Sequence, residues 1–171
     1  MVKSKKQVTY SNAWYAVAVA RIVLGFVFLW AFLDKTLGLG FATEAGKAAW
    51  VNGGSPTTGF LKFGVNPESP FASFFNGLAG NVLVDWLFML ALLGIGLALV
   101  LGIGLRIAAV AGTALLVMMW AAQIPLENNP AVDDHIVYAL MLWVFALGHR
   151  KWSLVDTWMQ TPVVKRTPWL W

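Results

Sequence analysis

Residues 82–105 have the sequence VLVDWLFMLALLGIGLALVLGIGL, and they give the clearest indication of the fold. It is apolar throughout except for a single charged residue, Asp85. The hydrocarbon core of a bilayer is about 30 Å thick, and about 20 apolar residues of α-helix cross it. This stretch is therefore predicted to be a membrane-spanning helix.

Three further stretches of the same kind flank it. Residues 13–33 are interrupted only by Arg21, and residues 107–124 carry no charge. A fourth stretch is predicted at 134–150, but its uncharged part, 136–148, would cover only about 20 Å at 1.5 Å per residue. The expected fold is all-α, an integral membrane four-helix bundle.

The short fourth stretch leaves two alternatives open. In the first, the helix continues past Trp152 while Arg150 and Lys151 extend to the membrane surface. In the second, the outer end of the helix lies below the surface, so that His135 and the acids beside it border a sunken polar cavity.

Composition agrees with a membrane protein of one domain, residues 1–171. The chain is 59% hydrophobic and 12% charged, whereas soluble domains average about 25% charged residues. It has no cysteine, which excludes iron–sulfur clusters and c-type haem held by this chain. His135 and His149 would lie about 21 Å apart on one helix, so a haem between them is not expected, and neither is a flavin.

The segment between the first two spans, residues 34–81, is rich in glycine, proline, serine and asparagine but also in aromatic residues. A flexible linker would not need the aromatic residues. We therefore expect short interfacial helices in this outer loop.

Basic residues predict the orientation of the chain, because cytoplasmic loops are enriched in lysine and arginine. With the N-terminus inside, eight basic residues are cytoplasmic and three are outside. The inner set is Lys3, Lys5, Lys6, Arg106, Arg150, Lys151, Lys165 and Arg166, and the outer set is Lys35, Lys47 and Lys62. We expect a protein of the cell membrane, surrounded by lipid, with both termini in the cytoplasm. The basic residues adjoin the spans, so nucleic acid is not an expected partner.

Four segments resemble the DoxX/DoxD family of small four-helix membrane proteins. They are RIVLGFVFLW (21–30) with Asp34-Lys35, TGF (58–60), LVLGIGLR (99–106) and GHRKWSLVD (148–156). The resemblance implies a membrane subunit of a quinone-linked oxidoreductase that acts with other subunits, and thiosulfate:quinone oxidoreductase has a DoxD-type subunit. The alternatives are a non-catalytic membrane anchor or assembly subunit of a redox complex and, as a third class, a small transporter.

Arg21 lies in the inner half of the first span, where a charge must face protein or water. Asp156 is the one acid predicted at that level, and we expect a structural Arg21–Asp156 ion pair. Binding of a quinone or an anion and extension to the surface are the alternatives.

Ionisable residues also gather at the outer ends of the spans. Asp85 and His135 are candidate catalytic residues, and a quinone head group or an anionic substrate would bind among them at a site formed by Trp30, Asp34, Lys35 and Trp86. We expect these residues to converge below the outer surface, with no metal site. The alternative is a set of helix caps with a Lys35–Asp85 ion pair, which would hold the bundle together and nothing more.

Overall fold

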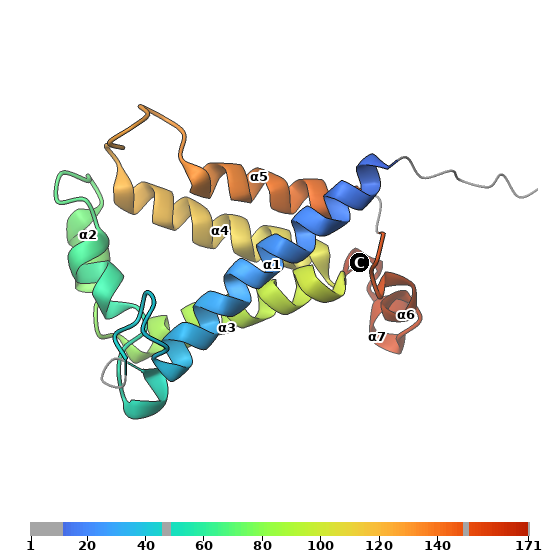
Figure 1. Cartoon of the computed structure of the whole chain (residues 1–171), viewed down its shortest axis with the longest axis horizontal. Coiled ribbons are helices and arrows are strands. Elements are labelled where there is room, and N and C mark those ends of the chain that lie inside the picture. Colours follow the sequence, from blue (N-terminus) through green and yellow to red (C-terminus); the bar gives the residue numbers. More distant parts are fainter. Residues whose placement is uncertain (1–11, 46–48, 149–150, 171) are drawn as a thin grey trace, which may run out of the picture.

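A computed structural model describes residues 12–45, 49–148 and 151–170 (Figure 1). The molecule is 69% helical, and no strand occurs among the described residues. The predicted all-α class is confirmed. The N-terminal lysines, Lys47, His149 and Arg150 lie outside the described residues.

Among the described residues, three helices are long and apolar enough to cross a membrane: α1 (Ala13–Leu37), α3 (Val82–Leu101) and α4 (Leu105–Gln123). They correspond to the first three predicted spans and support a multi-pass membrane protein. Helix α5 (Asp134–Leu147) is apolar but has only 14 residues, or about 21 Å. A fourth crossing therefore stays a prediction.

The helices pack as two pairs, α1 with α3 and α4 with α5 (Figure 1). Helices α3 and α4 are joined by a tight turn at Gly102–Gly104 and separate toward the end where α2 lies. Glycines bring α1 and α3 close together: a Cβ on Gly25 would lie 2.9 Å from the Leu99 Cβ, and one on Gly96 would lie 2.7 Å from Leu29 Cγ.

Large apolar side chains cover the outside of these helices. They are exposed in the isolated chain, which is the arrangement expected where lipid is the solvent. Examples from α1, α3, α4 and α5 are Val23, Phe26, Leu87, Leu90, Met118, Leu140 and Leu147.

The segment between α1 and α3 contains short helical turns: η1 (Trp50–Asn52), η2 (Phe60–Gly64) and α2 (Ala72–Gly77). Leu61 and Phe75 from this segment form a small buried cluster with Ala122 near the end of α4. The segment therefore packs against the end of α4. Its placement at the membrane interface stays a prediction.

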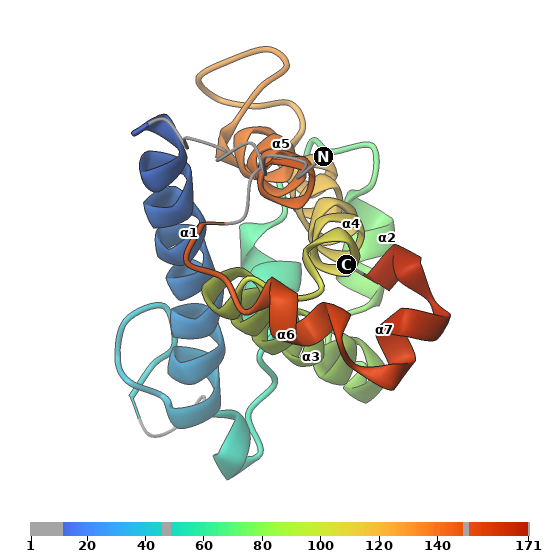
Figure 2. The same cartoon turned by 90° about the vertical axis from the view of Figure 1, so that its right-hand side faces the viewer.

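The C-terminal segment lies at the opposite end of the molecule, which is the end where α1 starts (Figure 1). It consists of α6 (Val155–Met159), α7 (Pro162–Arg166) and η3 (Pro168–Leu170), and Figure 2 shows α6 and α7 away from α1. Helix α5 ends at Leu147, so the alternative in which this helix continues past Trp152 is wrong. The chain turns instead, and the backbone N–H of Leu154 bonds the Leu101 carbonyl at 2.9 Å.

Candidate functional site

Arg21 is buried at the end of the bundle where the C-terminal segment lies, with 3% of its surface exposed. Its Nη2 donates hydrogen bonds to the backbone carbonyls of Trp152 at 2.7 Å and Lys151 at 3.3 Å. Its Nη1 lies beside Gly102 and has no hydrogen-bond partner. We call Arg21, Gly102 and residues 151–154 the inner cluster.

The inner cluster corrects the predicted ion pair. Asp156 is exposed, and no ion pair joins it to Arg21 in the described part of the chain. The turn after α5 presents backbone carbonyls to the guanidinium, while Val155 faces inward and Asp156 therefore faces out. Arg21 does attach the C-terminal segment to α1, but through the backbone.

Asp85 is buried in the first turn of α3. Its Oδ1 accepts hydrogen bonds from Ser55 Oγ at 2.8 Å, Thr57 Oγ1 at 2.6 Å and the Thr57 backbone N–H at 3.3 Å. Ser55 Oγ in turn accepts bonds from the hydroxyl and N–H of Thr58. The carboxylate thus fastens the chain just before η2, and a negative charge is favourable at a helix N-terminus. The predicted Lys35–Asp85 ion pair is not formed.

Of the residues predicted for quinone binding, Asp34 and Trp30 both contact Phe41, whereas Trp86 contacts Trp50. Asp34 is 1% exposed; its Oδ1 accepts from the Phe41 N–H at 3.2 Å, and its Oδ2 has no partner. Trp30 meets the Phe41 ring edge-on at 5.0 Å between centroids. Trp86 makes a similar contact with Trp50 at 4.6 Å.

Lys35 lines a pocket of about 390 Å³ between α3, α4 and the segment that contains η2 and α2. We call it the apolar pocket, because every other lining residue except Thr57 is apolar. The lining consists of Lys35, Pro56, Thr57, Phe60, Leu61, Phe75, Leu78, Val84, Leu87, Phe88, Ala91, Ala111, Ala114, Leu115, Met118 and Met119. The pocket has the volume of a small-ligand site.

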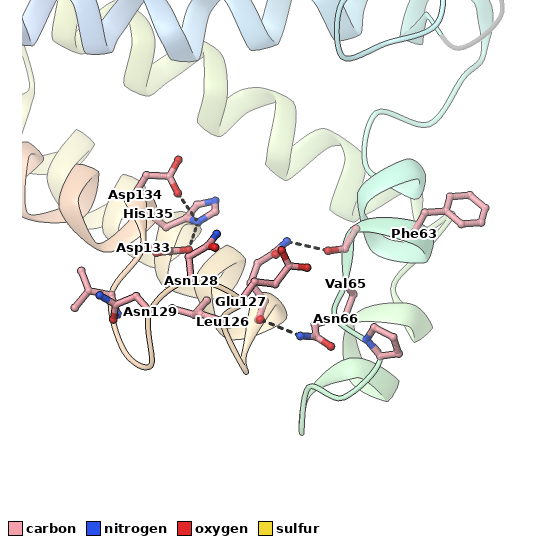
Figure 3. A pocket seen from close by; sticks show the side chains of 14 residues that line it. Phe63, Val65, Asn66, Leu126, Glu127, Asn128, Asn129, Asp133, Asp134 and His135 are labelled. Atoms are coloured by element: carbon pink, nitrogen blue, oxygen red, sulfur yellow. Dashed lines mark hydrogen bonds and ion pairs between the residues drawn. The ribbon is translucent and has the colours of Figure 1, made fainter.

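A second, polar depression of about 650 Å³ lies where α4 ends and α5 begins; we call it the outer hollow (Figure 3). His135, Asp133 and Asp134 line one side, and Val65 and Asn66 the other. Glu127 adds a third carboxylate to the lining. The hollow is therefore unsuited to an anionic ligand.

The three residues at the start of α5 form a compact group. His135 Nδ1 lies 2.7 Å from Asp133 Oδ2 and 3.8 Å from Asp134 Oδ1. Their ligand atoms lie within 4.8 Å of one another and could hold a metal ion. However, Asp133 also caps α5 by accepting from the Ile136 N–H at 3.3 Å, which is a structural task. The prediction of no metal site stays a prediction.

These contacts also affect protonation. Burial by itself raises the pKa of the Asp133 carboxyl, but hydrogen bonds from His135 and the Ile136 N–H, together with the charge of His135, outweigh burial. The pKa of Asp133 consequently lies below its ordinary value.

The predicted single outer site is not what the structure contains. Lys35 lines the apolar pocket and His135 lines the outer hollow, while Asp34 and Asp85 line neither. The outer loop separates them: η2 and its neighbours border both spaces, with Phe60 and Leu61 on one and Phe63 and Gly64 on the other. Sequence reasoning missed the pocket residues of α4, which carry no polar group to mark them.

Comparison with family models, curated proteins and solved structures found no match to this chain.

Proposed function

We propose that this chain is a four-span membrane subunit of a quinone-linked oxidoreductase, similar to the DoxX/DoxD proteins that it resembles. The observation that carries the proposal is the placement of Lys35. Of the residues predicted for quinone binding, Lys35 is the one that lines an apolar pocket of ligand size. An ammonium group can donate a hydrogen bond to a quinone carbonyl and stabilise the negative charge that the ring gains on reduction.

Four crossings with both termini in the cytoplasm are part of this proposal. Helix α5 packs against α4 along its length, and the C-terminal segment lies at the same end as the start of α1. Four basic residues, Arg106, Lys151, Lys165 and Arg166, lie in the segments at that end. This arrangement suits the inner side of a membrane.

The inner cluster offers further support for the resemblance. Three of the four segments on which it rests meet there: Arg21 from the first, Gly102 from the third and Trp152 from the fourth. If the three segments were unrelated apolar helices with glycines, there would be no reason for Arg21, Gly102 and Trp152 to lie together.

A non-catalytic anchor or assembly subunit is the second candidate. Asp85 favours it, because this predicted catalytic residue is occupied by Ser55 and Thr57. Three carboxylates line the outer hollow, so it would repel an anionic electron donor such as thiosulfate. In either case a partner subunit must bind the electron donor.

Quinone reduction by the membrane complex, measured with and without this chain, distinguishes the candidates. We expect thiosulfate-dependent reduction of a quinone analogue to require the chain, and Lys35→Met to lower it by about tenfold, because a charge-assisted hydrogen bond is lost. Lys62→Met, at an exposed lysine, should leave it unchanged. Full activity of a complex that lacks the chain would contradict the catalytic proposal.

A further inference from the structure

Lys35 places a positive charge at the wall of the apolar pocket. Its Nζ lies 6.0 Å from the centroid of the Phe88 ring. No ion pair or hydrogen bond joins this ammonium group to another residue in the part of the chain that the structure describes. Asp34 is its neighbour in the chain; Asp34 Oδ1 accepts a hydrogen bond from the Phe41 N–H, and Asp34 Oδ2 forms no hydrogen bond. The cation of the pocket thus has no direct ion-pair partner among the described residues, although the charge of Asp34 acts on it from a greater distance.

A charge in apolar surroundings is unfavourable unless it is paired. An anionic ligand would supply the missing partner through a charge-assisted hydrogen bond. The pocket therefore favours a ligand with a negative head group over a neutral ligand of the same shape.

The other lining residues indicate what the part of the ligand beyond its head group must be. The pocket extends to Leu87 and Met118, which are 59% and 49% exposed on the apolar outside of α3 and α4. In a membrane this surface faces hydrocarbon. A ligand would enter sideways from the bilayer with an apolar chain, and only its head would reach Lys35.

The size of the head group is limited as well. Lys35 supplies a single positive charge, and Thr57, the other polar lining residue, already donates its hydroxyl hydrogen to Asp85. A phosphate would need more donors than this wall offers, whereas one carboxylate matches one ammonium group. A volume of about 390 Å³ is at the lower end of small-ligand sites, which favours one chain over two.

We propose that the apolar pocket binds a long-chain carboxylic acid from the bilayer, with its carboxylate on Lys35 Nζ and its chain between α3 and α4. The proposal goes beyond the oxidoreductase role and does not depend on it. A bound acid would occupy the place suggested for the quinone and would compete with it.

Binding of oleate to the purified full chain in nanodiscs, measured by native mass spectrometry and by titration, tests the proposal. We expect oleate to bind at least about tenfold more tightly than oleyl alcohol, which has the same chain without the charge. Lys35→Met should remove this preference, and Lys35→Arg should keep it. Lys62→Met is the matched control and should bind as the wild type does.

A second variant keeps the test valid if Lys35→Met does not fold. Ala114 lines the pocket and is exposed, so Ala114→Phe should fill the pocket and weaken oleate without altering the fold. Equal binding of oleate and oleyl alcohol, or oleate binding that neither variant reduces, would overturn the proposal. Tighter binding of decylubiquinone than of oleate would also overturn it while leaving the oxidoreductase proposal intact.

Discussion

Two cations on the same helix have opposite surroundings. Arg21 and Lys35 are fourteen residues apart on α1, or about 21 Å along its axis. Arg21 is enclosed at the inner end, where its guanidinium bonds two backbone carbonyls and no pocket adjoins it among the two that we describe. Lys35 lines the apolar pocket at the other end and forms no direct ion pair with any described residue.

The surroundings of these two cations indicate how a charged residue in a membrane helix can be interpreted. Such residues mark functional sites by default, and by sequence alone both cations qualify. A cation such as Arg21, whose Nη2 donates to two backbone carbonyls, attaches one part of the chain to another. A cation such as Lys35, which lines an apolar pocket and forms no direct ion pair, is available to a ligand.

Substitution of Gly102, whose Cα lies beside the Arg21 guanidinium, should reduce stability more than any other change considered below. Gly102 and Gly104 both have positive φ, +71° and +58°. Gly104→Ala should destabilise the protein by about 1 kcal/mol, because the left-handed conformation is unfavourable for alanine. Gly102→Ala should cost about 1–3 kcal/mol more, because the added Cβ would collide with Arg21 Nη1 and Ser153. Thermal unfolding in detergent measures both.

Gly104 is a close control, since nothing lies within 4 Å of the Cβ that alanine would add there. Equal destabilisation by the two substitutions would mean that the inner cluster is not tightly packed.

Arg21 itself comes next. Arg21→Met leaves the carbonyls of Lys151 and Trp152 without their donor and should lower the free energy of unfolding by about 2 kcal/mol. It should also raise proteolysis of the C-terminal segment. Arg166→Met, at an exposed arginine, should change stability by less than about 0.5 kcal/mol. An Arg21→Met protein as stable as the Arg166→Met protein would contradict a structural role.

Asp85 provides an outer counterpart to Arg21. Asp85→Asn keeps an oxygen acceptor but loses its charge, so the bonds from Ser55 and Thr57 weaken by about 1 kcal/mol in total. We expect faster hydrogen exchange at residues 55–58, with little change at the exposed Asp156→Asn control. If quinone reduction disappears while exchange is unaltered, Asp85 is catalytic rather than structural.

The smallest effect concerns Asp133. Its pKa in the folded protein lies below the ordinary value, so the ionised carboxylate stabilises the fold above the unfolded pKa of about 3.9. That contribution is lost as the pH falls through the lower folded value. The stability of the wild type relative to Asp133→Asn should therefore shrink below about pH 4. Glu68→Gln, at an exposed glutamate, should show no such change.

Sequence reasoning located the apolar helices well, because runs such as 82–105 leave few alternatives to a buried or membrane helix. It erred where partners depend on how the chain turns. The Arg21–Asp156 ion pair was predicted because both residues were expected at the same depth in the membrane. In the structure, the turn after α5 provides backbone carbonyls as hydrogen-bond acceptors for Arg21 instead. The single outer site failed for a similar reason, since the packing of η2 between two spaces has no signature in the sequence.

The inner cluster and the apolar pocket lie toward opposite ends of α1, and we propose that α5 crosses the membrane as α1 does. The chain has no cysteine, so single cysteines can be placed at two exposed positions that flank α5, Asn128→Cys and Thr157→Cys. Labelling of intact cells with a membrane-impermeant maleimide should modify Cys at 128 and leave Cys at 157 unmodified until the membrane is permeabilised. Equal labelling of both positions in intact cells would contradict a membrane crossing by α5.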